Sequence, residues 1–263
     1  MKRILGILGI FAGWELAART VNSPMFSTFT TTLLSLWKIR TVLYPHITTS
    51  LLHVLLGFSI AVVTGTLLGI LIHESRFIEL MMMPVIDAMR PIAALTMFPL
   101  LITILGLGIK SKAFVIFWTA WPAIVLNTIE GLRNVDQSII EAANLDGCTR
   151  IQLLTHIKAP LAASMYITGL RIGLSGGWIS VVSAEMLGSS AGLGYAILHY
   201  SQTFRFPEMY AIILVIATIG LLMNMGLALL QNSVGLENTS PFIRFNDRAS
   251  SFGFDHNLFT KKE

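Results

Sequence analysis

Residues 47–72 read ITTSLLHVLLGFSIAVVTGTLLGILI and contain no lysine, arginine, aspartate or glutamate. A transmembrane helix needs about 20 consecutive, mostly apolar residues to cross the hydrocarbon core of a bilayer. Gly57, Gly65 and Gly69 lie along this segment, and small residues let helices approach one another closely in lipid. The stretch therefore predicts a membrane-spanning helix that packs against other helices.

The composition of the whole chain indicates the same class of protein. Of the 263 residues, 54% are hydrophobic and 12% are charged, whereas a soluble domain has about 25% charged residues. A chain of this size still exposes a large surface, so much of that surface must face lipid. We predict an all-α polytopic membrane protein. The net charge of +4 is spread over loops and not gathered in a stripe, which argues against nucleic-acid binding.

Hydropathy and helix-breaking residues divide the chain into about six spans. We expect them at residues 4–18, 47–72, 80–109, 113–129, 161–187 and 210–230. Residues 20–46 are expected to form a polar loop, and residues 189–209 a loop or a re-entrant piece. Pro84, Pro91 and Pro99 interrupt the third span. This span should pack inside the bundle, where neighbours can satisfy the freed backbone groups.

The spans divide the chain into three parts and predict its orientation in the membrane. Residues 1–46 hold the first span and an extracytoplasmic loop, residues 47–230 form the transmembrane domain, and residues 231–263 form a polar cytoplasmic tail. An even number of spans places both termini on one side of the membrane. If that side is the cytoplasm, the cytoplasmic loops hold more lysines and arginines than the outer loops, as the positive-inside rule requires. The loop at 131–160 then lies in the cytoplasm.

This loop carries the most specific pattern in the chain. It reads Glu141-Ala-Ala-Asn-Leu-Asp-Gly147, followed by Ile157 and Pro160. Ser138 lies three residues before Glu141, which is the spacing of a capping box at a helix N-terminus. Gly147 can adopt the left-handed conformation that ends a short helix, and Pro160 fits the first turn of the next helix. We expect two short helical stretches joined by a turn.

From residue 46 to residue 230 the chain resembles the membrane permeases of the nitrate/sulfonate/taurine class of ABC importers. Further matching blocks are His46-Ile-Thr-Thr-Ser-Leu-Leu, Arg90-Pro-Ile, Asn127-Thr-Ile-Glu-Gly-Leu-Arg133, Gly169-Leu-Arg-Ile-Gly173 and Ala184-Glu-Met-Leu-Gly188. The resemblance implies the type I ABC importer (MetI-like) fold, with cytoplasmic coupling helices at 138–159. It assigns contact with the ATPase to Ser138, Glu141, Ala142, Ala143, Gly147, Ile157 and Pro160.

The resemblance also implies the partners and the location. Permeases of this class work with a dimeric cytoplasmic ABC ATPase, a second permease copy in a homodimer, and an extracytoplasmic solute-binding protein, in the bacterial cytoplasmic membrane. Nitrate, taurine, another sulfonate or a related small organic solute is the implied cargo, and no cofactor is implied. The sequence holds no Gly-x-x-x-x-Gly-Lys-Ser/Thr phosphate loop. We therefore expect a separate chain to hydrolyse ATP and this chain not to be an enzyme.

Ionisable and aromatic residues within the spans are candidates for the transport pathway, since such groups are costly in lipid. Asp87 and Arg90 can pair on a helix; they either line the pathway or form an interfacial ion pair. Glu185 is a candidate for a gate residue or a residue that lines the bundle, and Trp178 either faces the pathway or packs between helices. The six histidines and the single Cys148 show no metal-ligand spacing, and no catalytic triad pattern occurs.

A secondary transporter driven by an ion gradient is the alternative class. Such carriers often contain internal repeats and buried titratable groups near the bilayer midplane. The two halves of this chain show no clear repeat, and buried charges are few. A polytopic membrane enzyme would need clustered histidines or carboxylates near one interface, and the sequence shows no such cluster.

Overall fold

A computed structural model describes residues 2–21, 23 and 25–233; of residues 2–8, 10, 232 and 233 it describes only the backbone. All regular structure in these ranges is helical. The elements are α1 (Lys2–Val21), α2 (Phe29–Glu74), α3 (Arg76–Met89), η1 (Ala94–Met97), α4 (Phe98–Leu105), α5 (Ile109–Arg133), α6 (Gln137–Leu145), α7 (Arg150–Gln152), η2 (Leu153–Lys158), α8 (Ala159–Gly188), α9 (Leu193–Gln202) and α10 (Phe206–Ser233). The predicted tail lies outside the described residues from residue 234 onward.

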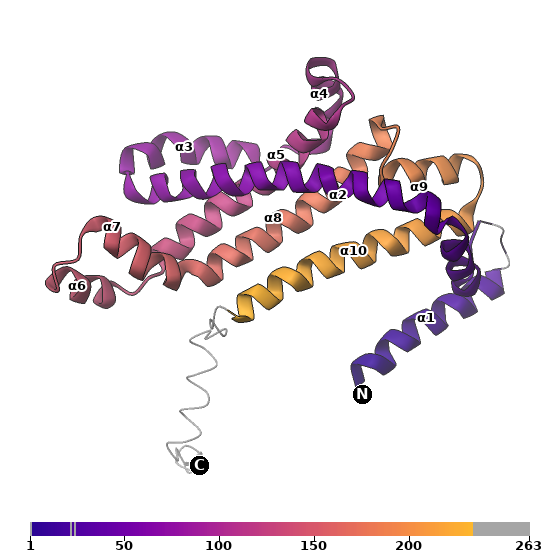
Figure 1. Ribbon diagram of the computed structural model, residues 1–263, viewed down its shortest axis with the longest axis horizontal. Coiled ribbons are helices and arrows are strands. Elements are labelled where there is room, and N and C mark those ends of the chain that lie inside the picture. The colour runs from indigo at the N-terminus through magenta and orange to yellow at the C-terminus, as the bar shows by residue number, and fades with distance from the viewer. Residues whose placement is uncertain (1, 22, 24, 234–263) are drawn as a thin grey trace, which may run out of the picture.

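Helix α5 is at the centre of the bundle and packs against both α2 and α8. Figure 1 shows α2, α8 and α10 running along the length of the molecule, with α3 folded back beside α2. The short helices α6 and α7 lie at one end, and α9 lies near the other end beside the start of α10. The long helices thus connect one end of the bundle, formed by α6 and α7, with the other end, where α9 lies.

Close packing of α2 on α5 depends on residues that have no side chain. A Cβ atom at Gly57 would lie 2.5 Å from the carbonyl oxygen of Ala113, and one at Gly69 would lie 2.7 Å from Cβ of Thr128. Small residues permit such approach in lipid, where helices associate mainly through van der Waals contact. The glycines predicted to form a packing face on the second span therefore do so.

Three helical segments of the described chain are long and apolar enough to cross a bilayer: Phe29–Glu74, Ile109–Arg133 and Phe206–Gln231. Two bent pairs raise the number to as many as five if each pair is one span. One pair joins α3 to η1 and α4 at an angle of 84°, and the other joins the helix ending at Gly188 to α9 at 48°. The predicted re-entrant piece thus contains α9, and the count of six spans stays a prediction.

The predicted polar loop at 20–46 is wrong from Phe29 onward, because α2 begins there. Thr28 caps this helix by accepting a hydrogen bond from the N–H of Thr31 at 3.2 Å. Buried side chains follow at helical spacing: Thr32, Ile39 and Leu43.

Helix α2 is also longer than a membrane span requires. Its 46 residues extend about 69 Å at 1.5 Å per residue, more than twice the ~30 Å of the hydrocarbon core. The segment before Pro45, with Lys38 and Arg40, is the less apolar part. The predicted domain boundary at residue 46 therefore falls inside a continuous helix.

Candidate functional site

The short helix α6 begins directly after Asp136, whose side chain caps it. The Asp136 carboxylate accepts hydrogen bonds from the backbone N–H and from the hydroxyl of Ser138, both at 2.9 Å. These bonds, the backbone one most, lower the pKa of Asp136 because they favour the ionised carboxylate. The predicted capping box of Ser138 with Glu141 is therefore wrong, and Ser138 lies inside the helix. Sequence analysis missed Asp136, although aspartate is a preferred N-cap residue.

Helix α6 ends in a Schellman motif at Gly147. The φ angle of Gly147 is 78°. Its N–H donates to the carbonyl of Asn144 at 3.1 Å, and the N–H of Cys148 donates to that of Ala143 at 3.1 Å. A left-handed φ costs a residue with a Cβ atom roughly 1–2 kcal/mol. The left-handed turn predicted at Gly147 is confirmed.

The next helical stretch starts with a reciprocal capping box. The side-chain oxygen of Gln152 accepts a hydrogen bond from the N–H of Thr149 at 2.9 Å, and the Thr149 hydroxyl accepts one from the N–H of Gln152 at 3.4 Å. Two open backbone donors at the start of α7 are satisfied in this way. Sequence analysis missed the pair, although Thr149-Arg-Ile-Gln152 has the spacing of this motif.

A widened helical turn, η2, joins α7 to the long helix α8. Leu153–Lys158 has π-helical hydrogen bonding, and α8 continues from Ala159. Pro160 has no backbone N–H and its ring crowds the preceding turn, so a π segment at this point lets the helix continue past it. Pro160 lies in the first turn of α8 as predicted, and Ile157 is half-buried in η2.

Side-chain contacts hold this loop against the end of α2. The Nζ atom of Lys158 donates a hydrogen bond to Nε2 of His73 at 2.9 Å. Nε of Arg150 lies 3.3 Å from a carboxylate oxygen of Glu74. An exposed ion pair contributes little by itself, but together these contacts set the position of α7 and η2 relative to α2. The loop is thus connected to α2 by side chains and to α8 by the continuous helix.

The outer surface of the loop carries exposed apolar side chains. Leu145 is 89% exposed and Ile151 is 75% exposed. Glu141 and Ala142 are exposed beside them, while Ala143 is buried. Large apolar residues left this exposed are candidates for contact with a partner protein. The exposed surface of the segment combines these apolar side chains with the carboxylates of Glu141 and Asp146 and the guanidinium group of Arg150.

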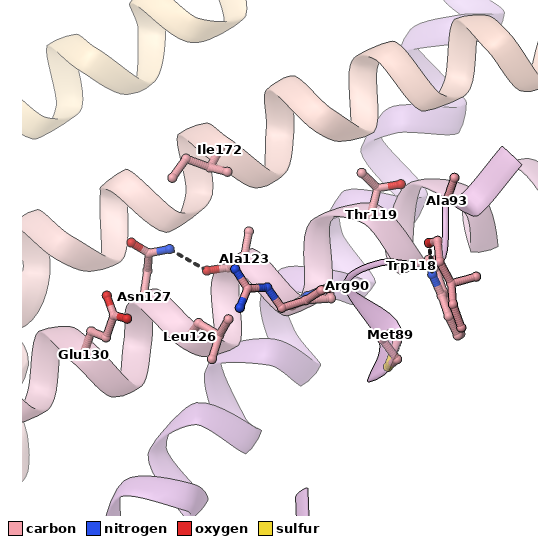
Figure 2. A pocket seen from close by; sticks show the side chains of 12 residues that line it. Met89, Arg90, Ala93, Trp118, Thr119, Ala123, Leu126, Asn127, Glu130 and Ile172 are labelled. Atoms are coloured by element: carbon pink, nitrogen blue, oxygen red, sulfur yellow. Dashed lines mark hydrogen bonds between the residues drawn. The ribbon is translucent and has the colours of Figure 1, made fainter. Parts of the chain in front are cut away.

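A cavity of about 440 Å³ lies between the segment Met89–Ala93, helix α5 and Ile172 of α8. Figure 2 shows the Arg90 side chain extending toward Asn127, with Trp118 and Thr119 at the other end of the cavity. The Trp118 indole N–H donates a hydrogen bond to the carbonyl of Ile92 at 3.2 Å. This bond links the indole ring on α5 to the segment that follows α3.

Asp87 and Arg90 lie one helical turn apart at the end of α3. Their nearest charged atoms are 3.8 Å apart, and the side chains are 60% and 61% exposed. Arg90 borders the cavity, whereas Asp87 is not among the residues that line it. The pair therefore has the geometry of an exposed ion pair, and Arg90 brings a positive charge to the cavity.

Glu185 is fully buried and borders no open surface of this chain, so of its two predicted places the structure shows the one inside the bundle, and a role as a gate stays a prediction. Its carboxylate accepts hydrogen bonds from the hydroxyl of Ser50 at 2.8 Å and from the N–H of Gly194 at 3.0 Å. Nδ1 of His53 lies 2.9 Å from the other carboxylate oxygen. The network joins α2, α8 and α9. Sequence analysis missed Ser50 and His53, although polar residues in an apolar span are a recognised signal.

Trp178 also lies inside the bundle. It is 6% exposed, and its indole N–H donates a hydrogen bond to the carbonyl of Ile216 in α10 at 3.2 Å. A Cβ atom at Gly220 would lie 3.0 Å from the indole ring. Of the two predicted roles, packing between helices is the observed one, and the position facing a pathway is corrected.

Apolar helices long enough to cross a bilayer, with the capped segment 136–160 at one end of the bundle, are the architecture of a polytopic membrane protein. Residues 61–235 match the family described as binding-protein-dependent transport system inner membrane component. The match covers well over half of the chain, which therefore belongs to this family of ABC importer permeases.

Several characterised or named permeases are similar in sequence. The taurine transport system permease TauC of Escherichia coli K12 is 32% identical over 189 residues, which are 72% of this chain and 69% of that protein. The nitrate import permease NrtB of Synechocystis sp. PCC 6803 is 34% identical over 186 residues, which are 70% of this chain and 67% of that protein. The putative aliphatic sulfonates transport permease SsuC of Bacillus subtilis 168 is 30% identical over 192 residues, which are 73% of this chain and 70% of that protein.

The fold is also that of a solved transporter. The permease chain in inward-facing conformations of the MetNI methionine ABC transporter superposes with a TM-score of 0.64 at 17% sequence identity, covering 75% of this chain and 98% of that chain. Identity this low is evidence for the fold alone. The predicted all-α, MetI-like type I importer fold is confirmed.

Proposed function

We propose that two copies of this permease form the pathway of an ATP-driven importer, and that the segment from Asp136 to Pro160 docks on a separate cytoplasmic ABC ATPase. The observation that carries the proposal is the construction of this segment. Both of its helical stretches are capped, it is tied to α2 and α8, and it exposes Leu145 and Ile151. Family membership supports the ATPase and a solute-binding protein as partners.

The proposed mechanism is alternating access by rigid-body motion. ATP binding closes the ATPase dimer and draws the two docked segments together. Each segment passes its displacement to α8 through the continuous helix, and to α2 through Lys158–His73 and Arg150–Glu74. Because α5 packs against both of these helices, the bundle moves as a unit and opens the pathway on the other side.

Docking on a cytoplasmic ATPase sets the orientation. The loop between α5 and α8 is then cytoplasmic, both termini of a six-span chain are cytoplasmic, and α9 lies at the outer end, where a solute-binding protein delivers its ligand. Relatives named for taurine, nitrate and aliphatic sulfonates favour a small anionic solute as the cargo.

Reconstitution tests this function. Proteoliposomes that contain the permease, its ATPase and its binding protein are expected to take up the ligand of that binding protein only with ATP, and orthovanadate should stop the uptake. The permease alone should not hydrolyse ATP. Uptake driven by a proton or sodium gradient in vesicles without the ATPase would contradict the proposal and favour the secondary-transporter alternative.

A further inference from the structure

The cavity beside α5 combines a large volume with mostly apolar walls. At about 440 Å³ it is in the range of pockets that hold small organic molecules, roughly 300–1,000 Å³. Its walls include Trp118, Pro122, Leu126 and Ile172. Apolar walls contribute to the free energy of binding only when the ligand also buries apolar surface against them.

Arg90 is the positive charge in this cavity. Among the described residues its polar partner is Asp87, at 3.8 Å, which is longer than a charge-assisted hydrogen bond of about 2.7–2.9 Å. The guanidinium group therefore keeps most of its five N–H donors available. Its planar fork matches an oxyanion better than an ammonium group does.

Two carboxylates limit how much negative charge the cavity accepts. Glu130 lines the cavity, and Asp87 is paired with Arg90 just outside the lining. In Figure 2 Glu130 lies beyond Asn127, away from Trp118. A ligand with one anionic group can place it on Arg90 and its body toward Trp118, whereas a second negative charge would meet the carboxylates.

We propose that this cavity is a transport-pathway site for an organic monoanion, a sulfonate or carboxylate with an apolar body, held by Arg90 at the charged end and by Trp118 and Leu126 along the body. The proposal rests on the proposed function and names the class of its cargo. Such a site should bind organic oxyanions more tightly than a bare inorganic anion such as nitrate, because nitrate would leave the apolar walls without a partner.

Binding to the full-length permease in complex with its ATPase, in lipid nanodiscs and without the binding protein, tests the site by titration calorimetry. The probes are methane-, ethane-, propane- and butanesulfonate, with sodium nitrate and sodium sulfate for comparison. We expect the Kd to fall about fourfold for each added methylene, and both inorganic anions to bind at least tenfold more weakly than butanesulfonate. Nitrate binding as tightly as butanesulfonate, or affinity independent of chain length, would overturn the proposal.

Variants then locate the site. Arg90→Gln should weaken butanesulfonate binding at least about tenfold, since a hydrogen bond to a charged group is lost. Arg205→Gln is the matched control, because Arg205 also pairs with a carboxylate three residues away and is 52% exposed, but lies outside the cavity; it should bind as the parent does. Equal affinity of the Arg90→Gln and parent proteins would place the site elsewhere.

The two proposals fail in different ways. Co-purification with the ATPase and ATP-dependent uptake test the importer function and do not depend on this cavity. A complex that assembles and transports, yet binds no sulfonate at Arg90, refutes the cavity assignment alone.

Discussion

Glu185 places a carboxylate in the interior of the bundle, where an unsatisfied charge would be costly. Ser50, His53 and the N–H of Gly194 surround it within hydrogen-bonding distance. Gly194 is required for this approach, because a Cβ atom there would overlap the carbonyl of Val182 in α8. At the scale of single residues, the network holds α9 against α2 and α8 at the end of the molecule opposite α6 and α7.

Glu185→Ala should therefore destabilise the fold by about 2–5 kcal/mol, since it leaves buried hydrogen-bonding groups of Ser50, His53 and Gly194 without an acceptor. The purified variant should unfold at a clearly lower temperature than the parent. Glu141→Ala, which removes an exposed carboxylate, is the control and should leave the midpoint unchanged. Equal midpoints for all three proteins would show that the network does not stabilise the fold.

At the scale of elements, the docking segment consists of short helices that depend on their ends. Isolated helices of this length are marginal in water, so α6 and α7 need the cap at Asp136, the turn at Gly147 and the box of Thr149 with Gln152. These local devices give the segment one shape before any partner binds. A preorganised surface docks with a smaller entropic cost than a flexible one.

Gly147→Val tests the turn. No atom of the described structure lies within 4 Å of a Cβ atom built there, so the φ of 78° alone opposes the substitution. We expect normal membrane insertion, weaker association with the ATPase and loss of transport. Gly147→Asn is the matched control, because asparagine tolerates the left-handed region, and it should keep most of the activity. A valine variant that transports at the parent rate would refute a role for the turn in coupling.

The cap of α6 predicts a dependence on pH. The pKa of Asp136 is lowered from 3.8 in the folded state by the bonds from Ser138, so the cap stabilises α6 above that value and is lost as pH falls through the folded pKa. Amide exchange at Ser138 should be faster in Asp136→Ala than in the parent at neutral pH. The difference should vanish well below pH 3.8. A difference that persists there would show that the ionised carboxylate is not the cap.

At the scale of the whole molecule, the two ends of the bundle have different chemistry. Figure 1 places α6 and α7 at one end and α9 at the other. The proposed orientation assigns the first end to the cytoplasm and the second to the outside. One residue reports directly on this assignment, because Cys148 is the single cysteine of the chain and lies in the docking segment.

A membrane-impermeant maleimide should label Cys148 in inside-out vesicles and not in intact spheroplasts. Bound ATPase should slow the labelling, because Cys148 lies next to the turn at Gly147. In a Cys148→Ser protein with Thr203→Cys, which moves the thiol to the exposed end of α9, the accessibility should be reversed. Labelling of Cys148 from the outside would overturn the orientation and the docking role together.

The sequence predicted those features that depend on neighbouring residues. The apolar run at 47–72 identified a span, and its glycines identified the face that packs on α5. The turn at Gly147 and the position of Pro160 were predicted correctly, because backbone conformation at glycine and proline is a local property. The helix from Phe29 was missed because polar and charged side chains are interspersed in this segment. The helical spacing of its buried residues becomes visible only in the folded structure.

Tertiary structure decided what each charged or aromatic residue does. Glu185 and Ser50 are 135 residues apart in sequence, and only the packing of α8 on α2 turns a candidate gate residue into a buried hydrogen-bond centre. Arg90 borders a cavity because the segment after α3 crosses α5. The sequence by itself determined the class of protein, the apolar span at 47–72 and the turn at Gly147, since hydropathy and glycine conformation act over a few residues. The positions of side chains relative to a pathway arise from contacts between distant helices, which only the fold specifies.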